Sequence, residues 1–118
     1  MGGVEMTRRE FEEHVADALD LIPPELTQAM SNVVVLVEDE PPPGSPNLLG
    51  LYQGVSLTRR TTDYSGGLPD HIFIYRGPLL RYCHDVDDLV EQIAVTVVHE
   101  VGHHFGISDE RLHELGWG

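Results

Sequence analysis

The stretch that most constrains the fold runs from His99 to Asp109 and reads HEVGHHFGISD. His99 and His103 are four residues apart, so on a helix their imidazoles lie about one turn apart on one face and can share a metal ion. Glu100 follows the first histidine, about 100° round the helix, from where its carboxylate can reach a water bound to that metal. The stretch therefore predicts a helix that carries one zinc ion, Zn²⁺.

The helix must end soon after His103 if the rest of the motif is to contribute. A helical continuation would carry Asp109 roughly 9 Å further along the axis. Gly106 can adopt the left-handed conformation cheaply, so the chain can fold back and offer Asp109 as a third ligand. Three protein ligands with one position left for water are typical of a catalytic zinc rather than a structural one.

Other assignments of these residues stay open at this stage. A chance histidine pair is disfavoured, because the pair, the glutamate, the glycine and the aspartate must all coincide. Asp109 can instead cap a short last helix, although a capping Ser108 would free it. His113, Glu114 or water are alternative third ligands. His104 projects onto the apolar side of the helix, which favours a packed histidine over a ligand.

Hydrophobic periodicity and turn residues place the elements before the motif. Thr7 and Glu10 can form a capping box, and Pro23 and Pro24 end the helix that it starts. The expected elements begin with a helix over residues 7–22, a short turn from Pro24 or Glu25 and a buried strand over 33–37. A proline-rich loop over 40–47 and an edge strand with a bulge or bend within 48–57 should follow. A turn-rich stretch over 58–69 then leads to a strand over 71–75, which Gly77 and Pro78 should close.

A long helix should lead into the metal motif. Asp85 can cap it, and Asp87 and Asp88 suit the positive end of its macrodipole. Its run 95–98 has poor helix propensity, so the helix should depend on burial against the sheet. The expected apolar stripe consists of Val86, Val90, Ile93, Val97 and Val101, with Ala94 beside it.

Charge and composition limit the partners and the compartment. The 118 residues include 7 basic ones, all Arg, and 20 acidic ones, and the net charge of −13 argues against nucleic acid and anionic membranes. This length suits a single domain over residues 1–118. Cys83 is the only cysteine, which we expect to be a small buried residue rather than a nucleophile. With no apolar leader or membrane span, we expect a cytoplasmic protein.

The motif HEVGHHFGISD resembles that of the zincins, and more narrowly that of small bacterial proteins described as minimal zincin-like or possible zinc metallopeptidases. Further resemblance lies in LLGLYQGVSLTRR, GLPDHIFIYRGPLLR and DERLHELGW. It implies an α+β, zincin-like fold, in which a small mixed sheet of three to four strands packs on an N-terminal helix and a long active-site helix. The strand over 71–75 should lead into that helix. An antiparallel edge strand, which we place in 49–57, should bind an extended peptide by strand addition, with Gly50 and Gly54 marking the approach of the other backbone.

The resemblance implies a zinc-dependent peptidase, a hydrolase in which a metal-activated water attacks the peptide bond and Glu100 is the general base. Zinc would be held by His99, His103 and Asp109. One alternative is a non-catalytic zinc-binding module that grips peptides on its edge strand, against which the intact Glu100 counts. A second is an accessory protease that acts on one partner protein and leaves generic peptides uncut. Tyr52 or Tyr64 could stabilise an oxyanion.

The pattern departs from the metzincins in one respect. Those peptidases have a methionine turn after the third ligand, whereas here every methionine precedes the motif. The floor of the site must therefore be built otherwise, with Leu112, Leu115 and Trp117 as candidates.

Overall fold

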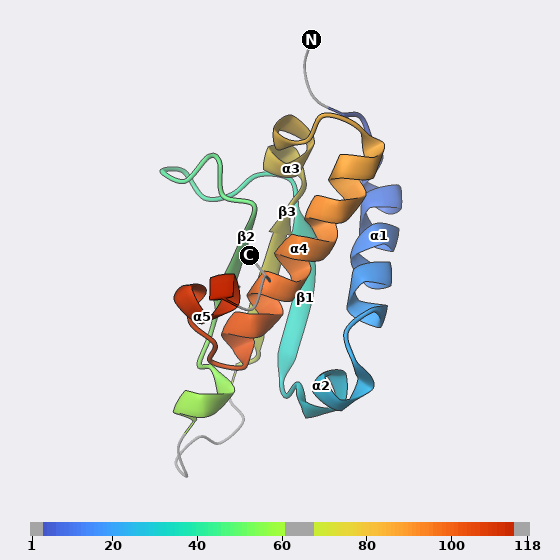
Figure 1. Ribbon diagram of the computed structural model, residues 1–118. Coiled ribbons are helices and arrows are strands. Elements are labelled where there is room, and N and C mark those ends of the chain that lie inside the picture. The colour runs from blue at the N-terminus through green and yellow to red at the C-terminus, as the bar shows by residue number, and fades with distance from the viewer. Residues whose placement is uncertain (1–3, 61–67, 115–118) are drawn as a thin grey trace.

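The computed structural model describes residues 4–60 and 68–114 and has one layer of helices on one small sheet (Figure 1). Strand β3 is central, with β1 parallel to it on one side and β2 antiparallel on the other. This is the predicted α+β fold, with a mixed sheet and an antiparallel edge strand. The elements are α1 (Arg8–Asp20), α2 (Pro24–Ala29), β1 (Val33–Glu38), β2 (Gly50–Gln53), the 3-10 turn η1 (Leu57–Arg59), β3 (Asp70–Tyr75), α3 (Arg76–Tyr82), α4 (Val86–His104) and α5 (Asp109–Glu114).

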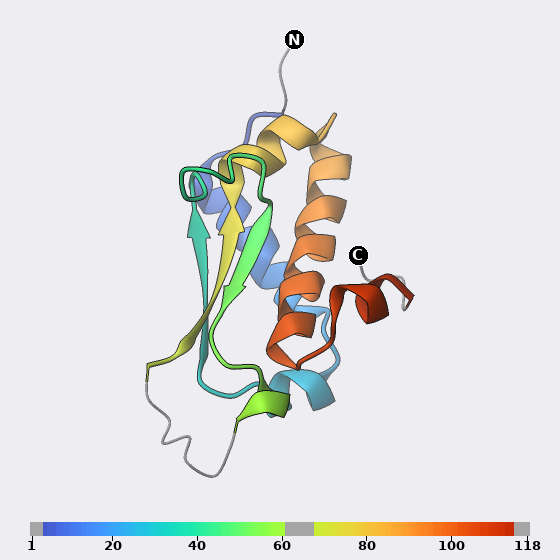
Figure 2. The same cartoon turned by 90° about the vertical axis from the view of Figure 1, so that its left-hand side faces the viewer.

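The core lies between the sheet and the helices α1 and α4, which cover the same face (Figure 2). Fully buried side chains come from both helices and from the central strand: Phe11 from α1, Ile72 and Ile74 from β3, and Leu89 and Ile93 from α4. Burying each of them stabilises the fold by about 1.5–3 kcal/mol. Among the described helices, none has both the length and the apolar character that crossing a membrane requires.

Helix α1 begins where the sequence predicted. The Thr7 side chain accepts a hydrogen bond from the Glu10 amide, and the Glu10 side chain reaches back to the Thr7 amide, which completes the capping box. The short turn after it is also present, as α2.

Helix α3 was not predicted. Gly77 and Pro78 were expected to end the strand over 71–75, but they form the first turn of α3. Proline is tolerated there because an amide in the first turn has no partner within the helix. Strand β3 therefore leads into α3, and only then into the long helix.

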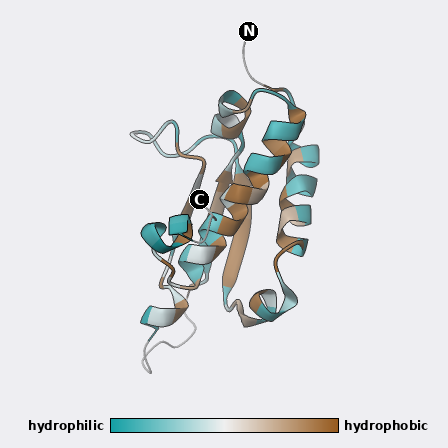
Figure 3. Ribbon diagram, viewed as in Figure 1, coloured by the Kyte–Doolittle hydropathy of each residue, from teal (hydrophilic) through white to brown (hydrophobic). Residues whose placement is uncertain are grey.

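The prediction that the strand over 33–37 is buried was wrong. The strand exists as β1, but it lies at an edge of the sheet and only one of its faces is covered. Val37 is buried towards the helices, whereas Val34 and Leu36 are 39% and 38% exposed. Figure 3 shows this apolar strand, and in Figure 2 none of the described helices lies over the outer face of the sheet.

The buried face of α4 differs from the predicted stripe at its start. Asp85 caps the helix by accepting from the Asp88 amide, as expected. Ile93, Val97 and Val101 are buried, but Val86 is 50% exposed and Leu89 takes the buried position. The helix turns its Thr96 and Glu100 side towards β2, where Gly50 has no side chain to keep them away. A Cβ at Gly50 would lie 2.8 Å from Thr96 Cγ2 and 3.1 Å from Glu100 Cγ.

Candidate metal centre

Three atoms suited to a metal meet at the C-terminal end of α4. The Nε2 atoms of His99 and His103 are 3.1 Å apart, and Asp109 Oδ1 lies 3.0 Å from the first and 2.9 Å from the second. Within residues 4–60 and 68–114, no other group of three His, Cys, Asp or Glu side chains is close enough to share an ion. Ligand atoms about 2.1 Å from a tetrahedral zinc lie about 3.4 Å apart, so these residues fit zinc after small shifts.

The turn after α4 brings the third residue back to the two histidines. Gly106 has φ of +83°, which is the left-handed conformation predicted for it. Its amide donates to the His103 carbonyl at 2.9 Å, and the Ile107 amide donates to the Gly102 carbonyl at 3.0 Å. These two bonds form a Schellman motif, which ends the helix and reverses the chain.

The same turn orients the imidazole of His103. Its Nδ1 lies 3.2 Å from the Ile107 carbonyl oxygen. A carbonyl only accepts, so Nδ1 carries the proton and Nε2 presents its lone pair to His99 and Asp109. Hydrogen bonding of the second ring nitrogen is a usual feature of histidines that bind metals.

Ser108, rather than Asp109, caps the last helix. The Ser108 hydroxyl accepts from the Arg111 amide at 3.2 Å, and its carbonyl accepts from the Leu112 amide at 2.9 Å. The Asp109 side chain is therefore released from capping, and it is 77% exposed. His113 and Glu114, the alternative third ligands, are exposed outside the cluster.

Glu100 lies beside the three residues in a different environment. The residue is only 7% exposed. Burial raises the pKa of Glu100 to about 7, with a smaller contribution from the nearby Asp109 carboxylate. A carboxyl group with such a pKa can both accept and donate a proton near neutral pH.

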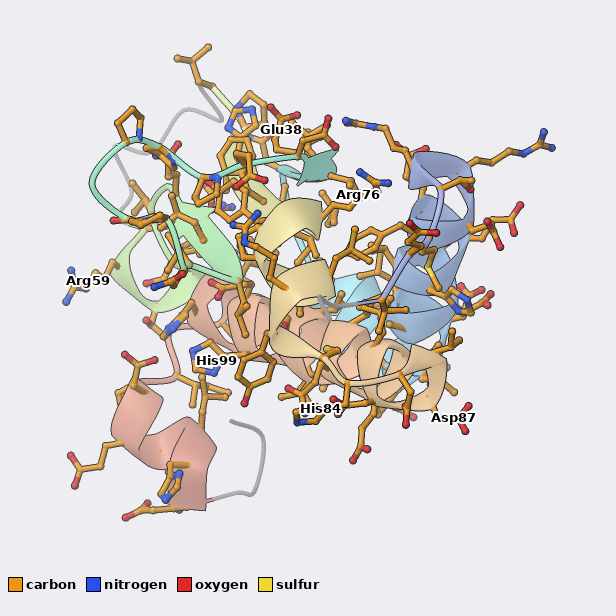
Figure 4. All side chains as sticks on the ribbon, turned by 90° about the horizontal axis from the view of Figure 1, so that it is seen from above. Glu38, Arg59, Arg76, His84, Asp87 and His99 are labelled. Atoms are coloured by element: carbon orange, nitrogen blue, oxygen red, sulfur yellow. The ribbon has the colours of Figure 1, made fainter. Side chains whose placement is uncertain are left out.

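A cleft of about 610 Å³ opens in front of the cluster, between α4, α5 and the β2 side of the sheet. Figure 4 shows His99 projecting from α4 on the side of α5, with Arg59 at the neighbouring turn. The lining residues include Leu48, Gly50, Tyr52, Ser56, Thr58, Arg59, His99, Glu100, Ile107 and Asp109.

The backbone groups of Gly50 point away from β3. The Tyr75 amide donates to the Leu49 carbonyl, so Leu49 is hydrogen-bonded to β3. In an antiparallel ladder the next residue, Gly50, then directs its amide and carbonyl to the opposite side of its strand.

Comparison with known proteins decides the family. The family model of zincin-like metallopeptidases matches residues 30–117. The chain belongs to this family. No curated protein matches it significantly. Among solved structures, a conserved hypothetical protein from Thermus thermophilus is similar, with 25% identity and a TM-score of 0.56 over 93% of this chain and 97% of the other.

Zinc binding is a general property implied by membership of the zincin-like metallopeptidases. Leu112 is fully buried against Gly102, where a Cβ would lie 2.5 Å from Leu112 Cδ2. It packs α5 against α4 but is not among the residues that line the cleft, so its role in the floor of the site stays a prediction. Leu115 and Trp117 lie outside the described residues.

His104 and Cys83 do not belong to the group of three ligand residues. His104 is fully buried, as predicted. Cys83 is 2% exposed, and burial raises the pKa of its thiol to about 11, so it is a packing residue. The Tyr52 hydroxyl donates to Asp70, and Tyr64 lies outside the described residues.

The sequence did not reveal one buried polar cluster behind the metal centre. It consists of Asp70, Arg60, Tyr52 and His104. The one signal for it in the sequence is Asp70 itself, a charged residue at the start of the apolar strand β3. Its partners Arg60, Tyr52 and His104 are 10, 18 and 34 positions away, so no local spacing connects them. Gly54 was expected to mark the approach of a peptide, but its close neighbour is the Asp70 side chain.

Proposed function

We propose that the protein is a zinc-dependent peptidase in which His99, His103 and Asp109 hold one zinc ion and Glu100 moves the proton. The observation that carries this proposal is the meeting of the three ligand atoms within 3.1 Å of one another beside a buried carboxyl group. The cleft in front of them gives a substrate access. Membership of the zincin-like metallopeptidases supports zinc as the ion.

When bound, zinc supplies a Lewis acid and lowers the pKa of a coordinated water. Glu100 accepts a proton from the attacking water and returns it to the departing amine. Burial raises the pKa of Glu100, which favours its protonated form, whereas the charge of a bound zinc ion would favour the carboxylate, so the site contains influences that suit each of the two transfers. His103 is held in one tautomer by Ile107, so its ligand nitrogen needs no reorientation.

The substrate in this proposal is an extended peptide that adds to the outer edge of β2. The backbone groups of Gly50 point away from β3, on the side that lines the cleft, which suits main-chain hydrogen bonds to a bound strand. The absence of a side chain at Gly50 keeps the strand close to Glu100. A peptide bound there would therefore pass near the general base.

A second candidate is a peptidase that acts on one partner protein. The wall that α5 contributes to the cleft is only six residues long, so the described residues offer a peptide limited contact beyond β2. Contacts elsewhere on a folded partner would then supply the missing binding energy. Cleavage of that partner, but not of short peptides, would favour this candidate.

The test compares Glu100→Gln with Glu91→Gln, an exposed carboxylate on the same helix. Zinc content is measured by elemental analysis, and cleavage is followed by mass spectrometry on a mixture of unstructured peptides. We expect one zinc per chain in both variants and a loss of cleavage of about 10²–10⁴-fold in Glu100→Gln alone. Unchanged cleavage would assign the general base elsewhere, and a chain without zinc would remove the metal centre itself.

A further inference from the structure

The carboxylate of Asp70 is the centre of the buried cluster behind the metal site. Its side chain is 3% exposed and sits at the first residue of β3. Oδ2 accepts from the Tyr52 hydroxyl, from Arg60 Nη2 at 2.8 Å and from His104 Nδ1 at 3.3 Å, while Oδ1 accepts from the Val55 amide at 3.2 Å. Four donors match the accepting capacity of one carboxylate.

The charge of Asp70 is compensated as well as buried. Burial opposes its ionisation, but the hydrogen bonds from Tyr52, Val55 and Arg60 outweigh this and hold the pKa of Asp70 below its usual value. Arg60 is itself only 10% exposed. Removing one partner of such a pair is costly, because a buried charge then has no counterion.

One side of this cluster fixes the wall of the cleft. Asp70 holds the Val55 amide, and Arg60 Nε donates to the Val55 carbonyl at 3.0 Å, so the segment from residue 55 to 60 is held at both ends. Thr58, in the middle of that segment, lies directly against Gly106, where a Cβ would come within 2.9 Å of Thr58 Cγ2. The wall therefore presses on the turn that returns Asp109 to the histidines.

The other side of the cluster fixes the end of α4. His104 Nε2 accepts from the Ser31 amide at 3.2 Å, so the ring proton is on Nδ1 and is donated to Asp70. This bond holds the residue that directly follows His103. Asp70 is thus bonded both to the end of the ligand-bearing helix and to the wall that packs on Gly106.

We infer that Asp70 is a positioning residue for the metal centre, holding the end of α4 and the cleft wall in the arrangement that brings Asp109 to His99 and His103. The inference rests on the proposed zinc site. A purely structural Asp70 would affect the free energy of unfolding and leave the affinity for zinc unchanged. A positioning Asp70 affects both, because the ligands lose their common geometry.

The experiment uses the full chain with Asp70→Asn and a matched control, Val15→Ala. Val15 is 5% exposed in α1, far from the cluster in sequence, and its truncation should destabilise the fold by about 1–3 kcal/mol. Zinc affinity is measured by competition with a chromophoric chelator well below the melting temperature. The visible spectrum of the Co²⁺ form reports the coordination geometry.

We expect Asp70→Asn to weaken zinc binding by about 10–100-fold and to change the Co²⁺ spectrum, while Val15→Ala leaves both unchanged. An Asp70→Asn protein with lower stability but wild-type affinity and spectrum would overturn the inference. If Asp70→Asn does not fold, Arg60→Gln takes its place with the same expectations, since it removes one of the donors to Asp70 and the bond to the Val55 carbonyl. Failure of the wild-type chain to bind zinc would instead refute the proposed function.

Discussion

His103 and His104 are adjacent in the sequence and belong to two different polar clusters. Each ring has an oxygen near Nδ1, the Ile107 carbonyl for His103 and the Asp70 carboxylate for His104. They differ at Nε2. That atom of His103 faces the ligand atoms of two other residues, whereas that of His104 accepts from the Ser31 amide and is fully buried.

The two histidines thus differ in what lies at Nε2. Other ligand atoms lie there in the candidate ligand His103, and a backbone amide lies there in the structural histidine His104. About 100° of helix rotation turns one ring to the cleft and the next into the core. Burial lowers the pKa of His104, which keeps it neutral and suited to one donated and one accepted bond. Substitution of His103 should therefore chiefly weaken metal binding, and substitution of His104 should chiefly lower the free energy of unfolding.

The largest expected effect is on zinc binding by His103→Ala. Losing one of three protein ligands should weaken the affinity for zinc by about 10³-fold, or about 4 kcal/mol. The free energy of unfolding without metal should change little, because His103 is only partly buried. Chelator competition and urea unfolding measure the two quantities. Equal losses in both would remove the distinction between the two histidines.

Asp109→Ala should have a somewhat smaller effect of the same kind. Zinc binding should weaken by about 100-fold, since water can fill the place of an exposed carboxylate. Unaltered affinity would show that His113, Glu114 or water completes the site. Glu110→Ala, at the neighbouring exposed position of α5, is the control and should bind zinc as the wild-type chain does.

His104→Ala should chiefly affect stability. It removes a fully buried ring and its bond to Asp70, so the free energy of unfolding should fall by about 2 kcal/mol. Zinc binding below the melting temperature should suffer much less than in His103→Ala. A zinc affinity as low as that of His103→Ala would place His104 among the ligands.

The smallest expected effect is on the pH dependence of stability. The folded pKa of Asp70 lies below its unfolded value of about 3.9, so its contribution is present above that pH and is lost as the pH falls through the folded pKa. Urea unfolding between about pH 2 and 6 should therefore show a shallower acid-side decrease for Asp70→Asn. A slope identical to that of the wild-type chain would mean that Asp70 is not an ionised group of the folded core.

The metal motif could be predicted because its geometry is local. The spacing of His99, His103 and Gly106 fixes a helix turn and a reversal through rules that need only neighbouring residues. Asp109 follows from the same reversal once Ser108 takes the capping role. The structure brings these residues together as expected, while their role in binding metal stays a prediction.

The buried cluster and the place of β1 could not be predicted because they depend on long-range packing. Asp70 meets Arg60 and His104 only after β3 has become the central strand. A run of apolar residues such as 33–37 is typical of a strand that is buried on both faces. The sequence of this run does not indicate that the described helices cover only one face of the sheet. Helix α3 could not be predicted because a Gly-Pro pair is typical of the end of a strand and is equally tolerated in the first turn of a helix.

The edge position of β1 also bears on how the protein behaves in concentrated solution. The Asn32 carbonyl accepts from the Asp70 amide of β3. Because backbone groups alternate in direction along a strand, the amides and carbonyls of Val33 and Val35 then point away from β3, to the open edge. Such an edge invites strands of other molecules, and the Arg8 side chain covers only the Val37 carbonyl. Mutual repulsion between chains of net charge −13 also opposes such association. Colloidal stability should accordingly be lowest near the isoelectric point, with β1 as the first segment to associate.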